Sequence, residues 1–330
     1  MSASLTYTKV EEMPKTNIRP AEAQWELLPQ EAEADATQLP EWLEPDAIDY
    51  QRYGLLQPPF SLTTDPSFMY LSDGHKMGLS KVSYMIQKRQ GLSVILGAIG
   101  SGKTMSGAWL YRRYHQLGNH RVAFLEEAQL PLTDRRSSLP FLRRVAAEFD
   151  LKRPRSISDQ MAVLRTFMVS SFRERQNVVL IIDEAQKLYA THLELIRQML
   201  NFESRGAGKL FQIVLIGTPE LRPLLSEEPT LESRVAVYAY LDALTREDTG
   251  NLISFRLMVA GRREPLFAAP AVDDIYLISS GVPRQICALA QLALIEAYNR
   301  GASLIDRPIV RQTVNEHYPH LVDRLRGESL

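Results

Sequence analysis

The sequence predicts an α/β fold in which helices cover a parallel sheet and a helical domain follows. Three observations support this prediction. Stretches such as "VVLIID" (178–183) and "FQIVLIG" (211–217) are apolar at almost every position, as expected for strands that are buried on both faces. Helical segments separate these strands, which favours parallel pairing. After about residue 244 the chain shows only segments with helical periodicity.

The individual elements follow from apolar periodicity and from helix caps. Strands are predicted at residues 92–97, 121–126, 178–183 and 211–217. Helices are predicted at 104–118, 138–150, 156–176 and 191–204, and four more at 246–261, 271–281, 284–301 and 306–318. Gly118 closes the first helix and a serine cap opens the third. Thr191 and Glu194 have the spacing of a capping box at the start of the fourth.

Charge and composition divide the chain into a tail and two domains. Residues 1–50 carry 11 acidic and 3 basic side chains, and removing these from the totals of 39 and 38 leaves 28 acidic and 35 basic. We predict an acidic, largely disordered tail at 1–50, an α/β domain at 51–244, and a helical lid with a short C-terminal extension at 245–330. Trp25 and Trp42 in the tail either dock on a partner or on the body of the protein, or are simply exposed aromatic side chains.

Cysteine usage and hydropathy argue against several classes of protein. Cys287 is the single cysteine among 330 residues, so neither a disulfide framework nor a cysteine-rich zinc site is expected. The N-terminus "MSASLTYTKVEEMPK" lacks a basic start followed by an apolar run. No stretch approaches the roughly 18–20 apolar residues of a membrane span. We therefore expect a cytoplasmic protein without a membrane partner.

The segment "GAIGSGKT" (97–104) fits the phosphate-binding pattern G-x-x-x-x-G-K-[ST], between a predicted strand and a predicted helix. Backbone N–H groups of such a loop, here Gly97, Gly100, Ser101 and Gly102, curl around phosphate oxygens, and the helix N-terminus adds a positive dipole end. Lys103 is predicted to reach the β- and γ-phosphates, and the Thr104 hydroxyl to help hold Mg²⁺. ATP and Mg²⁺ are therefore the expected cofactors. A glycine-rich turn that fits by chance is the alternative.

Polar residues at the ends of two further strands are candidates for the chemistry of hydrolysis. Asp183 ends "VVLIID" and is predicted to orient the magnesium shell, while Glu184 is placed to polarise an attacking water. Thr218 follows "FQIVLIG" and either contacts the γ-phosphate or water, or caps a helix that Pro219 begins. One residue can serve both roles.

Two arginines are candidates for contacts with the nucleotide. Arg284, in "SSGVPRQI", lies between two helices of the lid, where a cation could fold onto the γ-phosphate. Arg234, in "LESRVAVYAYL", is placed to reach the nucleotide of a neighbouring subunit. A solvated surface arginine is the alternative for each.

The ordered series of motifs resembles that of AAA+ ATPases of the ExeA/TnsC group. The resemblance rests on "YGLLQPPFSLTTDPSFMYLS", the phosphate-binding loop, "IIDEAQKL", "LIGTPEL", "SRV" and "GVPRQI", and covers about residues 52–318. It implies an AAA+ P-loop ATPase domain with a helical lid, in rings or helical filaments with ATP between subunits. By this resemblance Arg284 is a sensor-2 arginine, Thr218 a sensor-1 residue and Arg234 an arginine finger. Ala98 stands where relatives often carry glutamate, which removes a charge but no phosphate ligand.

Two branches of this group fit the body of the chain. ExeA-type secretion ATPases generally begin near the "YGL" segment and continue into a transmembrane helix and an envelope domain. About fifty residues precede that segment here and about a dozen follow the lid, which favours TnsC-type transposition regulators, including those of CRISPR-associated transposons. That branch implies a homo-oligomer on double-stranded DNA that links a TniQ-like target selector to the transposase. The alternatives are an ExeA-like envelope ATPase and a DNA-bound scaffold in which ATP serves as interfacial glue.

Basic residues after the second predicted strand are candidates for DNA contacts. The segment 132–156 contains Arg135, Arg136, Arg143, Arg144, Lys152, Arg153 and Arg155. Arg135 and Arg136 are predicted to contact phosphates, a kind of contact that positions a protein on DNA without reading its sequence. An exposed basic helix face is the alternative for any one of them.

Overall fold

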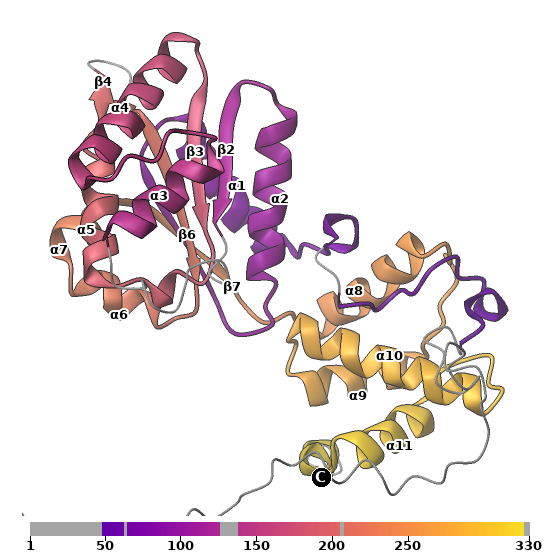
Figure 1. Cartoon of the computed structure of the whole chain (residues 1–330). Coiled ribbons are helices and arrows are strands. Elements are labelled where there is room, and N and C mark those ends of the chain that lie inside the picture. The colour runs from indigo at the N-terminus through magenta and orange to yellow at the C-terminus, as the bar shows by residue number, and fades with distance from the viewer. Residues whose placement is uncertain (1–47, 63–64, 126–137, 205–207, 327–330) are drawn as a thin grey trace, which may run out of the picture. The chain divides into compact units, whose positions relative to one another are not determined.

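A five-stranded parallel sheet forms the centre of the α/β domain (Figure 1). The computed structural model describes residues 48–62, 65–125, 138–204 and 208–326. Nearly all of the predicted tail, including Trp25 and Trp42, lies outside the described residues, as do Arg135 and Arg136. The strands are β1 (Leu92–Gly97), β2 (His120–Leu125), β3 (Asn177–Ile182), β6 (Phe211–Gly217) and β7 (Val235–Leu241). They lie in the order β2-β3-β6-β1-β7.

Alternate side chains of the central strands enter two separate apolar cores. Leu92, Val94 and Leu96 of β1 pack on the face that is covered by α3 (Ser138–Glu148), α4 (Ile157–Arg173) and α5 (Ala190–Met199). On the opposite face, Ile95 packs with residues of α1 (Asp73–Gln87) and α2 (Lys103–Gln116). β1, β3 and β6 are buried at every position, which confirms the prediction of a sheet covered on both sides.

Short elements complete the α/β domain. They are the 3-10 helices η3 (Pro66–Phe68) and η6 (Ala185–Lys187), the hairpin of β4 (Glu203–Ser204) and β5 (Gly208–Lys209), and the helices α6 (Leu221–Ser226) and α7 (Pro229–Glu232).

The lid has its own apolar core. It contains α8 (Arg246–Val259), α9 (Ala269–Ser279), α10 (Pro283–Asn299), α11 (Arg307–His317), the 3-10 helix η7 (Pro319–Leu321) and α12 (Asp323–Arg326). Tyr53, at the end of the 3-10 helix η2 (Tyr50–Tyr53), is buried in the same core, as are Leu55 and Phe60. These three residues were predicted to belong to the α/β domain, but they pack with the lid. Among the described residues, no helix is long and apolar enough to cross a membrane.

Three local features differ from the sequence-based expectations. The helix α1 and the edge strand β7 were not predicted. The helix α5 begins at Ala190 with Tyr189 as its N-cap, and His192 rather than Glu194 completes the capping box. The predicted box of Thr191 and Glu194 is therefore wrong; the Glu194 carboxylate instead takes two hydrogen bonds from Arg197, at 2.6 and 2.7 Å.

Candidate functional site: a nucleotide pocket between sheet and lid

The phosphate-binding loop joins the buried end of β1 to the start of α2. Gly100 and Gly102 have φ angles of +83° and +96°, a region that favours glycine. A Cβ at Gly97 would lie 2.3 Å from the Ser101 hydroxyl, so this position also requires glycine. The N-cap of α2 is Gly102, which offers no side-chain cap. The first N–H groups of the helix are therefore left for another acceptor, as in phosphate sites.

Lys103 is a buried cation at the base of this loop. Its side chain is buried, and its Nζ donates to the Ala98 carbonyl at 3.0 Å. Burial lowers the pKa of Lys103, while the carboxylates of Glu184, Asp183 and Glu220 act in the opposite direction. The buried Ser101 hydroxyl has no hydrogen-bond partner among the described residues. Both polar groups fit a bound anion, because each is incompletely satisfied within the protein.

Asp183 and Glu184 directly follow β3, and of the two only Glu184 lines the cavity that the P-loop borders. Asp183 is buried, and its Oδ1 accepts the Glu184 N–H at 2.8 Å. Glu184 has a φ angle of +53°, a left-handed conformation that costs about 1–2 kcal/mol for a non-glycine residue. Strain of this kind is common at functional sites. Lys187 forms an ion pair with Glu184 at 3.1 Å, between Nζ and Oε2.

The Gln186 side chain connects Glu184 to the end of β6. Its Nε2 donates to Glu184 Oε2 at 2.9 Å, and its Oε1 accepts the Thr218 N–H at 3.1 Å. A Cβ at Gly217 would lie 2.7 Å from Gln186 Oε1, so glycine leaves the space that this amide occupies. The Gln186 amide therefore fixes the position of the Glu184 carboxylate relative to the end of β6.

Thr218 lines the cavity, but it is not the N-cap of a helix. The helix α6 begins at Leu221 with Glu220 at the cap position, so Pro219 is not the first helical residue. A hydrogen bond from the Thr218 side chain lowers the pKa of the exposed Glu220 carboxyl. The capping alternative for Thr218 is thus wrong.

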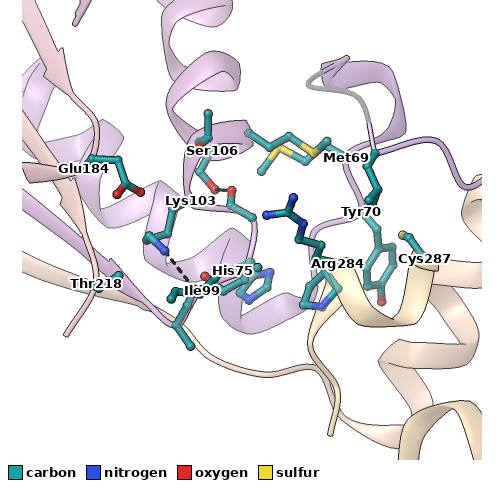
Figure 2. A pocket seen from close by; sticks show the side chains of 18 of the residues that line it. Met69, Tyr70, His75, Ile99, Lys103, Ser106, Glu184, Thr218, Arg284 and Cys287 are labelled. Carbon is teal, nitrogen blue, oxygen red and sulfur yellow. Dashed lines mark hydrogen bonds between the residues drawn. The ribbon is translucent and has the colours of Figure 1, made fainter. Parts of the chain in front are cut away.

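The lid closes the cavity from the other side. Residues of the P-loop, η6, the end of β6 and α10 line one cavity of about 1100 Å³. Arg284 lies in the first turn of α10, and its N–H donates to the Gly100 carbonyl at 3.2 Å. Figure 2 shows its side chain extending into the cavity between Lys103 and the lid. Its guanidinium has no ion-pair partner among the described residues. A cation is disfavoured at a helix N-terminus. An anion bound in the cavity would therefore stabilise Arg284 in the first turn of α10.

An apolar segment forms the wall opposite Lys103. Leu62, Met69 and Tyr70 line this wall, and Figure 2 shows Tyr70 beside Cys287. The Tyr70 hydroxyl donates to Asp248 of α8 at 2.8 Å, and burial raises the pKa of Tyr70 to about 12. The segment is also held by Arg256 of α8.

Arg256 is buried, and its Nη1 donates to the carbonyls of Pro59 and Ser61 at 3.3 and 3.0 Å. Its guanidinium carbon lies 5.6 Å from the centre of the Phe68 ring. A buried arginine that binds carbonyl groups fixes the path of this segment along the lid.

Arg234 does not reach the pocket of its own subunit. It immediately precedes β7, and the next residue, Val235, pairs with Leu92 at the start of β1. The P-loop follows the other end of β1, five residues further on. At about 3.3 Å per residue the two sites are about 16 Å apart along the strand. Its Nε donates to the Thr230 carbonyl at 3.2 Å.

The donor set fits a magnesium–nucleotide complex. Thr104 lines the pocket and Asp183 is buried beside Glu184. Among the described residues no group of three or more His, Cys, Asp or Glu side chains forms a metal site. Mg²⁺ usually takes one or two protein ligands and completes its shell with phosphates and water, so Thr104 and Asp183 would hold it only together with a nucleotide.

Among the pocket residues that were not predicted from the sequence, Gln186 and Arg256 hold other parts of the site in place. Gln186 lies inside "IIDEAQKL", and its two polar atoms were a usable signal, although their partners are set by the fold. Arg256 carries no local signal, because its partners are backbone carbonyls about two hundred residues away.

The strand order, the P-loop and the lid define an AAA+ P-loop fold with a nucleotide-binding site. Residues 86–225 match the family model described as AAA domain. The chain is 30% identical over 259 residues to General secretion pathway protein A of Aeromonas hydrophila, a match that covers 77% of this chain and 46% of that protein. The chain therefore spans about half the length of that curated relative.

Solved structures show the same fold. Cdc6p from Pyrobaculum aerophilum matches with a TM-score of 0.59 and 15% identity, over 76% of this chain and 70% of that chain. The structure of Drosophila ORC bound to DNA matches with a TM-score of 0.57 and 17% identity, over 88% of this chain and 71% of that chain. At these identities the likeness is one of fold. The similarity to a secretion-pathway protein corresponds to the alternative branch of the sequence analysis.

Proposed function

We propose that this protein is an ATP-hydrolysing AAA+ ATPase that assembles with further copies on duplex DNA. The observation that carries the proposal is the single cavity in which Lys103, Glu184, Thr218 and Arg284 meet. Lys103 and the N-terminus of α2 would bind the β- and γ-phosphates. Arg284 would bring the lid onto the γ-phosphate. Magnesium, held by Thr104 and Asp183 together with the phosphates, would neutralise charge on the transferred group.

Glu184 would act as the base of hydrolysis. Its carboxylate would accept the proton of a water that attacks the γ-phosphate, and the oxygen of ADP would leave. Gln186 would hold this carboxylate in place, and Thr218 would contact the water or the γ-phosphate. The placement of Arg234 away from its own pocket supports a contact with a neighbouring copy, head to tail. Such an interface repeats as a ring or a filament.

The biological process that we propose is the regulation of DNA transposition. The support is the ordered motif series of the ExeA/TnsC group, the net basic charge of residues 51–330, and a fold shared with a DNA-bound ORC structure. In this role the assembly would link a TniQ-like target selector to a transposase. Arg135 and Arg136 remain our candidates for phosphate contacts.

A secretion-associated ATPase is the second candidate function. It is favoured by the 30% identity to General secretion pathway protein A.

One experiment separates these two functions. Electrophoretic mobility shifts would be measured on a duplex of random sequence, with and without Mg-ATP. Under the transposition proposal ATP promotes binding, Lys103→Ala abolishes that stimulation, and Glu184→Gln gives complexes that persist after free ATP is removed. Lys81→Ala, at an exposed position of α1, is the control and should behave as the unaltered protein. No binding of the unaltered protein to duplex DNA in either condition would contradict the proposal and favour the secretion candidate.

A further inference from the structure

A basic side chain stands at the amino end of every strand of the central sheet. These residues are Arg121 in β2, Arg175 before β3, Lys209 before β6, Arg89 before β1 and Arg234 before β7. The strands are parallel and their starts are in register, with His120 opposite Asn177 and Leu92 opposite Ile213 and Val235. The cations therefore lie along one edge of the sheet, opposite the P-loop.

Direct contacts connect neighbouring members of this line. Arg121 Nε donates to the Gln176 side-chain oxygen at 2.7 Å, and Arg89 Nη2 donates to the Gln176 carbonyl at 2.9 Å. The Lys209 N–H donates to the Arg89 carbonyl at 3.0 Å. Lys209 lies near Arg234, whose charge, after burial, lowers the pKa of the Lys209 amine. The line is thus continuous across the sheet.

The hydrogen bonds that orient these arginines leave their charge uncompensated. Gln176 offers two neutral oxygens, which fix the guanidinium groups of Arg89 and Arg121 but neutralise neither. One Nη atom of Arg89 is buried without a hydrogen-bond partner among the described residues. Glu174 approaches Arg121 only to 4.0 Å, with both side chains more than half exposed, and a pair of that kind contributes little. Glu203 pairs with Lys209.

We propose that four of these cations, Arg89, Arg121, Arg175 and Lys209, together with the exposed Lys88 that directly precedes Arg89, form a binding surface for the sugar–phosphate backbone of duplex DNA. This surface, the amino-edge row, excludes Arg234, which the proposed function places on a neighbouring nucleotide. This proposal rests on the proposed function, in which the protein assembles on duplex DNA. The amino-edge row would be a second DNA-contacting surface, in addition to Arg135 and Arg136.

The dimensions and the chemistry of the row fit a regularly charged polymer. From β2 to β1 the row crosses three strand spacings, about 14 Å at about 4.8 Å each. A duplex presents about eight phosphate charges over that length, at about one per 1.7 Å. Three of the five members are arginines, whose planar fork of donors matches phosphate oxygens. A row of this kind contacts phosphates without reading bases.

The test measures duplex affinity of the full chain with Mg-ATP by fluorescence anisotropy at several salt concentrations. The row variant combines Lys88→Gln, Arg121→Gln and Arg175→Gln, three exposed positions. The control variant combines Lys81→Gln, Arg263→Gln and Arg300→Gln, which are also exposed positions and remove the same charge. ATP affinity and thermal unfolding of each variant establish that the fold and the pocket are intact.

The proposal expects a selective loss in the row variant. Removing three phosphate contacts should lower the slope of log K against log salt by about 3, at about 0.9 per contact. Affinity at low salt should fall by at least about tenfold, while the control stays within about twofold of the unaltered protein. Equal losses in the two variants, or none in the row variant, would overturn the row and leave the proposed function standing. Failure of the unaltered protein to bind the duplex would overturn both.

Discussion

Lys103 carries a charge that the nucleotide-free protein accommodates poorly. Its amine is buried and donates to a single carbonyl. Burial lowers the pKa of this amine, so the folded protein holds the proton less tightly than the unfolded chain does. The free-energy cost of the charge is fully present at neutral pH and fades as the pH rises toward the ordinary lysine value. A bound triphosphate would remove this cost.

We therefore expect Lys103→Met to stabilise the nucleotide-free protein while abolishing ATP binding. Methionine keeps the apolar stem and removes the charge. A gain of about 1 kcal/mol would raise the midpoint of thermal unfolding by about 2–4 °C. Calorimetry at pH 7 and pH 9.5 would measure this difference, which should shrink at the higher pH. The exposed Lys81→Met serves as the control. A variant less stable than the unaltered protein at pH 7 would contradict the argument.

Gln186 offers a test of how Glu184 is held. Gln186→Glu can still accept the Thr218 N–H, but it puts a second negative charge where a donor now lies 2.9 Å from Glu184. Like charge raises the pKa of a carboxyl, so the base would be protonated up to a higher pH. Hydrolysis should fall at least about tenfold at pH 7 and recover as the pH rises, with the KM for ATP little changed.

A matched pair outside the pocket controls for the general effect of this substitution. Gln198 Nε2 donates to Glu194 Oε1 at 2.8 Å in α5, so Gln198→Glu introduces the same repulsion away from the nucleotide. Its pH–rate profile should coincide with that of the unaltered protein. Identical profiles for the two variants would show that Gln186 has no specific effect on the base.

At the scale of elements, the junction between the sheet domain and the lid depends on one glycine. Gly281 precedes α10 and its carbonyl accepts the Leu244 N–H at 2.8 Å, where the chain passes from β7 to α8. Its φ angle is +74°, and a Cβ there would lie 2.0 Å from the Leu244 carbonyl oxygen. Backbone atoms cannot move aside as a flexible side chain does.

We expect Gly281→Ala to destabilise the protein by more than the conformational cost alone. A left-handed alanine costs about 1–2 kcal/mol, and the overlap with Leu244 adds to this. Gly118→Ala is the matched control, because its φ is +70° and a Cβ there meets nothing within 4 Å. Urea unfolding should give a clearly larger loss at Gly281, and ATP affinity should fall only there. Equal losses at both glycines would argue against a strained junction.

The elements that were predicted correctly are those whose own residues show a clear pattern, without reference to the rest of the chain. β1, β3 and β6 are buried on both faces, and their apolar runs show this directly. β7 is an edge strand with mixed burial, so its pattern is weaker and it was missed. The helix α1 contains two glycines, and a Cβ at Gly78 would already touch Ala239 of β7 at 3.4 Å. The glycine is therefore explained by the packing of α1 against β7, which the periodicity of the sequence does not show.

The same distinction applies to the site. The P-loop is contiguous in sequence, so its residues were predictable from spacing alone. The bridge from Glu184 through Gln186 to Thr218 joins two strands, and Arg256 holds a segment that lies far away in the chain. Such contacts depend on strand order and on the lid, which no local pattern specifies.

At the scale of the whole molecule, the pocket and Arg234 lie at opposite ends of the parallel strands. An arginine that cannot reach its own nucleotide contributes to hydrolysis only if a second copy presents its pocket to it. Each active site would then need Glu184 from one subunit and Arg234 from the next. The two ends of one subunit would be different surfaces, as in heterologous assemblies.

This arrangement predicts complementation between two inactive variants. Glu184→Gln and Arg234→Ala should each lower ATP hydrolysis at least about a hundredfold when assayed alone, because a base and an arginine finger each contribute at least that much. In an equal mixture, some interfaces combine the intact Glu184 of one variant with the intact Arg234 of the other. Those interfaces should restore a measurable fraction of the original rate. If Arg234 acted within its own subunit, every copy in the mixture would lack one of the two groups, and mixing would restore nothing. Arg222→Ala, at an exposed arginine of α6, should keep nearly full activity and rule out a general effect of lost charge.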